Sequence, residues 1–201
     1  MSRPLITSPG LKVGLLGGSF NPAHEGHRLL SLIALRQLQL DQIWWLVSPQ
    51  NPLKSANDMA PVGARLNQAA KIACDPRIFI SDMETRLGTR FTIDTVKALQ
   101  NRFRETKFVW LMGADNMIQL PRWAKWQELV ETIPIAVYPR PGYTLKARLS
   151  PAASAYRFAC LDAGDAPLLA QRQAPALCFL EGPQSPQSAT KIRAGADTVK
   201  R

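Results

Sequence analysis

Short, continuous apolar runs alternate along this chain with longer segments in which apolar residues recur every three or four positions. Runs of about four to eight residues that are apolar nearly throughout are typical of strands buried on both faces, as in a parallel sheet. The three- and four-residue spacing predicts helices with one buried face. We predict strands at Lys12–Leu16, Ile43–Ser48, Arg77–Ser81, Lys107–Met112, Ile133–Tyr138 and Leu177–Leu180, and helices at Gly26–Leu38, Val62–Cys74 and Thr92–Phe103. Because strands alternate with helices, the expected fold is α/β: a Rossmann-like, doubly wound, mainly parallel sheet with helices on both faces.

Two segments interrupt this alternation. Pro49–Pro61 is polar and rich in proline, and it follows the second predicted strand at the end where such folds bind ligands. Gly142–Pro175 is rich in Ala, Pro and Arg and has poor periodicity, so no element is placed there. Neither segment resembles an interdomain linker. We therefore expect one domain over residues 1–201, with a flexible N-terminus at 1–10 and an unassigned connection at 142–176.

The composition narrows the class of protein. A hydrophobic content of 46% fits a globular chain, and no run approaches the ~20 apolar residues that span a bilayer. Met1–Gly10 lacks the apolar core of a secretion signal, so we expect a cytoplasmic protein with no membrane partner. The three cysteines, Cys74, Cys160 and Cys178, are too scattered for a disulfide framework or a zinc site. The net charge of +10 is spread along the chain and suits nucleic acid or small polyanionic substrates, but no RNA-binding aromatic signature accompanies it.

Both histidines of the chain lie between the first predicted strand and the first predicted helix. A glycine pair follows the strand, a short polar turn comes next, and His24-Glu25-Gly26-His27 opens the helix. Small residues let backbone N–H groups approach an anion, and a helix N-terminus adds partial positive charge. Histidines at i and i+3 face the same way. The pattern predicts a phosphate site made by two imidazole N–H groups and the backbone of Gly17, Gly18, Ser19 and Phe20. Metal binding by the pair is the weaker alternative, because zinc usually needs about three or four protein ligands.

A second candidate phosphate motif, Ser188-Ala189-Thr190-Lys191-Ile192-Arg193, lies near the other end of the chain. Its simplest interpretation is a helix N-cap, since Ser and Thr favour that position. The Thr190 hydroxyl, the first helical amides and the Arg193 guanidinium are also suited to bind one phosphate.

These two motifs resemble the HxGH and S-x-T-x-I-R motifs of the nucleotidyltransferase superfamily that shares HxGH with class I aminoacyl-tRNA synthetases. Three segments between them narrow the resemblance: G-x-D at 113–115, P-x-W at 121–123 and R-P-G at 140–142. In that order they are similar to bacterial nicotinate-nucleotide adenylyltransferases. The resemblance extends from about Val13 to Arg193 and is weakest between Tyr143 and Ala176.

The resemblance implies transfer of the adenylyl group of ATP to nicotinate mononucleotide, giving nicotinate adenine dinucleotide and pyrophosphate, a step of NAD biosynthesis. It implies catalytic roles for His24, His27 and Arg193, with His27 as the better candidate at the α-phosphate. Besides the backbone of the turn after the first strand, the resemblance implies that ATP and its phosphates are bound by Lys54, Gly113, Asp115, Ser188 and Thr190. Asp115 is expected to contact the ribose or the base.

For nicotinate mononucleotide the resemblance implies binding by Phe91, Thr92, Trp123, Ala124 and Arg140. Trp123 matches the tryptophan that stacks on the pyridine ring, a contact that suits a flat indole and a cationic ring. Arg90-Phe91-Thr92 occupies the place of an S-Y-T segment whose backbone N–H groups receive the nicotinate carboxylate, and Thr92 also suits the N-cap of the next helix. Trp126 is expected on the same helical face as Trp123, in a packing role.

The chain departs from the family pattern at several positions. Ser19 and Asn21 stand where many relatives have Thr and Asp, so a hydroxyl is kept and a charge is lost. Leu53 replaces a histidine, which leaves Lys54 to reach phosphate in that segment.

The expected mechanism is an in-line displacement in which the 5′-phosphate of the acceptor attacks the α-phosphorus of ATP, which carries Mg²⁺ on its phosphates. The attacking group is already an anion, so no general base is needed, and no metal is assigned to protein ligands. Three alternatives stay open: an adenylyltransferase that accepts phosphopantetheine or nicotinamide mononucleotide, a basic nucleic-acid-binding module, and an inactive relative. The residues do not predict the oligomeric state.

Overall fold

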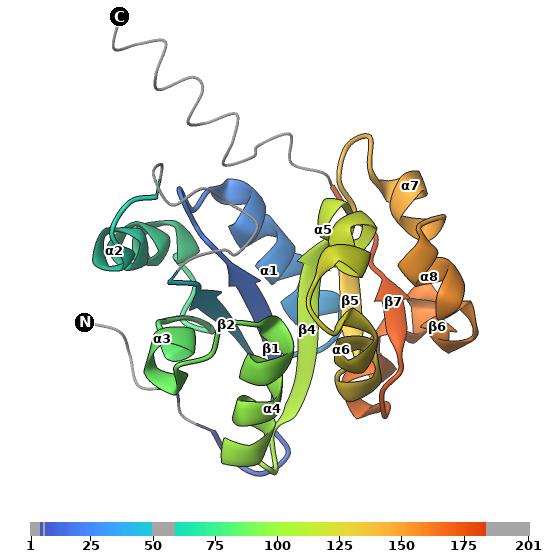
Figure 1. Cartoon of the computed structure of the whole chain (residues 1–201), viewed down its shortest axis with the longest axis horizontal. Coiled ribbons are helices and arrows are strands. Elements are labelled where there is room, and N and C mark those ends of the chain that lie inside the picture. The colour runs from blue at the N-terminus through green and yellow to red at the C-terminus, as the bar shows by residue number, and fades with distance from the viewer. Residues whose placement is uncertain (1–4, 6, 50–58, 184–201) are drawn as a thin grey trace, which may run out of the picture.

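The computed structural model describes residues 5, 7–49 and 59–183. In this part of the chain one sheet contains the strands β1 (Lys12–Gly18), β2 (Gln42–Val47), β3 (Ile78–Ser81), β4 (Lys107–Gly113), β5 (Ile135–Tyr138), β6 (Cys160–Leu161) and β7 (Leu177–Phe179) (Figure 1). The strand order is β3-β2-β1-β4-β5-β7-β6, and every neighbouring pair is parallel. The predicted doubly wound α/β fold is confirmed.

Helices cover both faces of this sheet. One face is covered by α1 (Glu25–Gln37), α2 (Val62–Ala73) and the 3₁₀ segment η4 (Ala163–Gln171), and the other by α3 (Met83–Leu87), α4 (Thr92–Arg102), α5 (Ala114–Gln119), α6 (Trp126–Thr132), α7 (Thr144–Arg148) and α8 (Pro151–Ala155). Two further 3₁₀ turns are η2 (Leu120–Arg122) and η3 (Arg157–Ala159).

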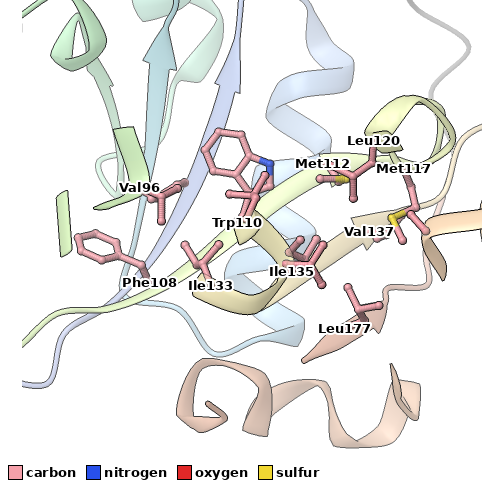
Figure 2. Packing of buried hydrophobic residues seen from close by; sticks show 14 of the residues in the cluster. Val96, Phe108, Trp110, Met112, Met117, Leu120, Ile133, Ile135, Val137 and Leu177 are labelled. Atoms are coloured by element: carbon pink, nitrogen blue, oxygen red, sulfur yellow. The ribbon is translucent and has the colours of Figure 1, made fainter. Parts of the chain in front are cut away.

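The continuous apolarity of the strands reflects burial on both faces. Trp44 and Trp45 are neighbours in β2, are both fully buried, and belong to hydrophobic clusters on opposite faces. Figure 2 shows part of the cluster that contains Trp44, where Trp110 of β4 lies between Val96 and Met112. A strand of this kind cannot alternate apolar and polar residues, because neither face meets water.

The order of the strands reverses between β1 and β4. The chain moves outward from β1 to β2 and β3 on one side, and then returns to place β4, β5, β7 and β6 on the other side. In open α/β sheets the crevice for ligands lies outside the carboxyl ends of the strands at such a reversal. Gly17–Gly18 and Gly113 end β1 and β4, so the glycine pair and the start of the G-x-D segment lie at this point.

The main difference from the sequence-based expectation is the segment 142–176, where no element was placed. It contains α7, α8, η3, β6 and η4, and each α-helix there has five residues, too few for a helical period to stand out. Strand β5 starts at Ile135 and not at Ile133, because the Ile133 N–H donates to Leu129 and ends α6. Of the described helices, none is both long and apolar enough to cross a membrane. The single domain over 1–201 and the flexible 1–10 segment stay predictions.

Candidate active site

The two histidines at the start of α1 form a reciprocal cap. His24 is the N-cap residue, and its Nδ1 accepts from the backbone N–H of Gly26 at 3.1 Å. His27 is three residues further, and its Nδ1 accepts from the backbone N–H of His24 at 3.2 Å. The ring centroids are 3.9 Å apart. Because each Nδ1 accepts a hydrogen bond, the hydrogen-bond network assigns the ring proton of each neutral imidazole to Nε2.

His24 is electrically neutral at physiological pH. Its side chain is buried, and burial together with the positive charge of Arg140 lowers its pKa to about 4. The imidazole therefore acts as a hydrogen-bond donor and not as a cation. The first-turn amides of α1 add partial positive charge at the same place. The predicted orientation of the two rings toward one site is supported by their capped geometry.

Packing beneath His27 fixes the turn that follows β1. Phe20 has a positive φ of 45° and is buried, with its ring 4.8 Å from that of His27 and stacked at 5.0 Å on that of Trp45. The Trp45 indole N–H donates to Ser31 at 2.8 Å, and the Ser31 hydroxyl donates to the His27 carbonyl at 2.9 Å. The Phe20 side chain belongs to the core, so only its backbone faces outward to a ligand.

The glycine pair serves packing as well as access. A Cβ built on Gly17 would lie 2.5 Å from Cη2 of Trp110, which is far inside contact distance. A Cβ built on Gly18 would lie 3.5 Å from the Phe20 ring, which is an ordinary van der Waals contact. Gly17 is thus required because the Trp110 ring occupies the space of its side chain, a reason that the phosphate interpretation of the motif did not include.

Arg65 was not predicted as a site residue, although it organises this region. Its buried guanidinium donates to four backbone carbonyls: Ser19 at 2.6 Å, Ser48 at 2.7 Å, Pro49 at 3.0 Å and Ala60 at 2.8 Å. These carbonyls come from the turn after β1, the end of β2 and both sides of the 50–58 segment. One sequence signal was available, since Arg65 lies four residues before Ala69 in the apolar stripe of α2.

A buried carboxyl group lies near the same strand end. Glu84 of α3 is buried, and burial raises its pKa to about 7 although a hydrogen bond with Ser48 opposes the shift. Asn21 also contacts this region, because its side-chain oxygen accepts from the backbone N–H of Ala60 at 3.3 Å. The amide at position 21 therefore joins the two loops that flank the end of β2.

At the carboxyl ends of β4 and β5 an ion pair joins two predicted site residues. Arg140 donates to Asp115 at 2.7 Å, and both side chains are about a quarter exposed. A Cβ on Gly113 would lie 2.6 Å from Asp115 Oδ1 and 3.5 Å from Arg140, so this glycine makes room for the pair. Since the Arg140 charge also lowers the pKa of His24, the ion pair and the histidines belong to one electrostatic environment.

The residues predicted to bind the pyridine nucleotide lie on three elements. Phe91 is the N-cap of α4 and Thr92 its first residue, so the expected N-cap at Thr92 is wrong by one position. The Phe91 carbonyl accepts from the backbone N–H groups of Asp94 and Thr95, which turns the peptide into the helix. Phe91 has an exposed ring that lies under the Arg90 guanidinium at 5.6 Å.

Trp123 and Trp126 do not share a helical face, contrary to expectation. Trp123 ends η2 with extended backbone, Ala124 is exposed, and Lys125 adopts a positive φ of 51° before α6 begins at Trp126. The chain reverses at Lys125, so the Trp123 ring lies edge-on to Trp110 at 6.4 Å. Trp126 instead packs edge-on to Tyr156 at 6.0 Å. The two indoles have separate surroundings.

The predicted residues Lys54, Ser188, Thr190 and Arg193 lie outside the described residues. Within the described ranges no three His, Cys, Asp or Glu side chains gather in a group that would hold a metal ion.

Comparison with known proteins adds a family relation. A family model described as cytidylyltransferase-like matches residues 15–195. A Parvibaculum lavamentivorans protein named probable nicotinate-nucleotide adenylyltransferase is 65% identical over 193 residues, covering 96% of each chain. A Cereibacter sphaeroides protein of the same name is 50% identical over 182 residues, covering 90% of this chain and 96% of that one.

Among solved structures, two of a Plasmodium falciparum nicotinic acid mononucleotide adenylyltransferase are similar. The one complexed with NaAD has a TM-score of 0.69 and 16% identity, covering 92% of this chain and 83% of the other. The one complexed with APC has a TM-score of 0.67 and 15% identity over the same shares. At this level of identity the likeness shows that the fold is shared.

Proposed function

The chain belongs to the nicotinate-nucleotide adenylyltransferases within the cytidylyltransferase-like family, and from this premise we propose how its own residues carry out the reaction. It is a nucleotidyltransferase of NAD biosynthesis that transfers the adenylyl group of ATP to nicotinate mononucleotide, with nicotinate adenine dinucleotide and pyrophosphate as products. The observation that carries the residue assignment is the reciprocal cap of His24 and His27 at the carboxyl end of β1.

The two imidazoles stabilise the reacting phosphates as neutral donors. The acceptor phosphate attacks the α-phosphorus in line with the leaving pyrophosphate, and no proton must be removed from the attacking oxygen. Catalysis then depends on position and on stabilisation of the charge that develops on the phosphate oxygens. The Nε2–H groups of His24 and His27 supply fixed donors, and His27 is assigned to the α-phosphate. The backbone of 17–20 approaches the phosphates at the N-terminus of α1.

The positive charge that the neutral histidines do not provide comes from other residues. We assign Lys54 and Arg193 to the β- and γ-phosphates, with the Ser188 and Thr190 hydroxyls beside them, on the basis of the sequence motifs. Mg²⁺ enters with ATP as part of that substrate and is held chiefly by its phosphates.

The acceptor binds at the ends of β4 and β5. Trp123 stacks on the pyridine ring, the first turn of α4 at Phe91 and Thr92 receives the carboxylate, and Ala124 borders the ring. Arg140 binds the acceptor while it holds Asp115, which is assigned to the ribose of ATP. The edge-on contact between Trp110 and Trp123 supports this arrangement, because it leaves Trp123 partly exposed at the strand ends.

Arg65 acts as a positioning residue. Its four carbonyl contacts hold the turn after β1 and the end of β2 in one geometry, so the phosphate-binding backbone is organised before substrate arrives. The enzyme works in the cytoplasm, in line with the small, soluble nucleotides that it converts.

The test is pyrophosphate release from MgATP with nicotinate mononucleotide, nicotinamide mononucleotide and 4′-phosphopantetheine as separate acceptors. We expect the highest kcat/KM with nicotinate mononucleotide. Turnover only with phosphopantetheine, or with no acceptor, would contradict the proposal. A nucleic-acid-binding role predicts instead a duplex affinity that falls steeply with salt, which a titration at two salt concentrations measures.

A further inference from the structure

The three fully buried tryptophans of the sheet differ in what their indole N–H groups contact. The Trp44 N–H donates to the Gln42 side chain at 3.0 Å, and the Trp45 N–H donates to Ser31 at 2.8 Å. The Trp110 N–H is equally buried, yet it has no acceptor among the described residues. Buried donors in native proteins are almost always paired, so this one requires an explanation.

The position of Trp110 points to a ligand. It lies in β4 beside β1, where the order of the strands reverses, and its ring fills the space above Gly17. Figure 2 shows the indole nitrogen on the side of the ring nearer Met112, toward the carboxyl end of β4. The donor is therefore turned toward the end of the sheet where the crevice lies, and the labelled side chains around it are apolar.

Trp123 connects this donor with the acceptor substrate. The two rings are perpendicular, at an interplanar angle of 88° with centroids 6.4 Å apart, and Trp123 is the residue assigned to the pyridine ring. Because the two rings are in edge contact, a pyridine ring that stacks on Trp123 would bind beside Trp110. A carboxylate is a pure acceptor, and a hydrogen bond to an ionised group is roughly twice as strong as one between neutral groups.

We propose that Trp110 determines specificity for the acid form of the substrate, by donating its buried indole N–H to the carboxylate of nicotinate mononucleotide. This inference rests on the proposed function. The side-chain donor adds to the backbone N–H groups at the start of α4, and it favours the carboxylate over the neutral amide of nicotinamide mononucleotide, because the charged acceptor gains more from a donor in apolar surroundings.

The first experiment compares Trp110→Phe with Trp44→Phe, a matched control whose N–H is already satisfied within the protein. For Trp110→Phe we expect kcat/KM for nicotinate mononucleotide to fall about tenfold or more, with KM for ATP unchanged and a loss of less than about threefold for nicotinamide mononucleotide. Trp44→Phe should change none of these ratios. Equal losses for the acid and the amide, or no loss, would overturn the inference.

The second experiment uses the wild-type protein, so its outcome does not depend on whether a variant folds. In a ¹⁵N spectrum of the wild-type protein, the indole resonance of Trp110, assigned by triple-resonance methods, should move downfield when nicotinate mononucleotide is added without ATP. It should move much less with nicotinamide mononucleotide, and the Trp44 resonance should stay in place. Normal turnover without this movement refutes the inference and leaves the function intact. Movement without turnover refutes the function and leaves only the contact between Trp110 and the carboxylate.

Discussion

The phosphate end and the acceptor end of the site are built by different means. At the end of β1 the polar groups are fixed by backbone hydrogen bonds: His24 and His27 cap α1, and Arg65 binds four carbonyls. At the ends of β4 and β5 side chains contact each other, through the Arg140–Asp115 pair and the Trp110–Trp123 contact. The first construction holds donors for a group that every nucleotide carries. The second makes specificity depend on contacts between side chains.

The most severe test of this contrast is His27→Ala at the phosphate end. It removes a donor to the reacting phosphate, and we expect kcat to fall roughly 10²–10³-fold, as for the loss of other preorganised donors. Pyrophosphate release measures the change. The variant also loses the cap on the His24 N–H, so His27→Asn, whose side-chain oxygen can restore that cap, serves as the control. If His27→Asn regained most of kcat, the role of His27 would be structural and not catalytic.

Arg65→Met should disturb the backbone geometry of the phosphate end, although Arg65 itself is not assigned a contact with substrate. It leaves several carbonyls without their donor, and we expect the free energy of unfolding to fall by about 3 kcal/mol. Urea denaturation measures this fall. Lys71→Met, at an exposed position of the same helix, is the matched control and should change stability by less than about 0.5 kcal/mol. An unchanged kcat in Arg65→Met would contradict the positioning role.

A third test uses two buried groups near the phosphate end whose pKa shifts have opposite effects on stability. The pKa of His24 is lowered to about 4 from 6.5, chiefly by burial, so its contribution is full above pH 6.5 and is lost as pH falls toward 4. The pKa of Glu84 is raised to about 7 from 4.5 by burial, so its contribution is full below pH 4.5 and is lost as pH rises through 7.

Removing either group should therefore expose the effect of the other. In His24→Asn, which keeps a capping oxygen, the free energy of unfolding should fall by about 2 kcal/mol between pH 5 and pH 7. In Glu84→Gln it should rise by about 2 kcal/mol over the same interval. Urea titrations at pH 5, 6 and 7 measure both slopes. Parallel slopes in the two variants would show that these groups do not control the pH dependence.

The smallest expected effect comes from Trp123 at the acceptor end, with Trp126 as its control. Trp123→Ala should raise KM for nicotinate mononucleotide about tenfold through loss of stacking, while KM for ATP stays the same. Trp126→Ala should lower stability and leave both KM values unchanged, because that ring packs on Tyr156. Steady-state kinetics with each substrate varied separately distinguish the two. A rise of KM in both variants would mean that the reversal at Lys125, and not Trp123 itself, determines binding.

Much of the fold could be predicted from the sequence because its strands are buried on both faces. The run Ile43–Ser48 contains no polar alternation, and the structure places a strand there within one residue of the expected bounds. The segment 142–176 escaped prediction because its elements are short and lack a period. The start of α1 could be located from the histidine spacing and the glycine pair, since both are local features.

What the sequence could not reveal depends on contacts between distant residues. The carbonyl partners of Arg65 lie up to 46 positions away in the chain, and an arginine in an apolar stripe does not specify them. The pairing of Arg140 with Asp115 spans 25 positions, although both residues were predicted as site residues for separate substrates. The Trp110 N–H lacks an acceptor among the described residues. This property depends on every side chain that surrounds the indole, so only the folded structure reveals it.

The contact between Gly17 and Trp110 has a consequence for how this sequence is able to diverge. Alanine at position 17 would place a methyl group where the indole now lies, so that substitution alone should be harmful. Once position 110 holds a smaller side chain, the same alanine should become tolerable, and the order in which the two changes occur would matter. The two positions form an epistatic pair, and a deep mutational library of position 17, made in the wild-type chain and in the Trp110→Leu variant, should show alanine tolerated only in the variant.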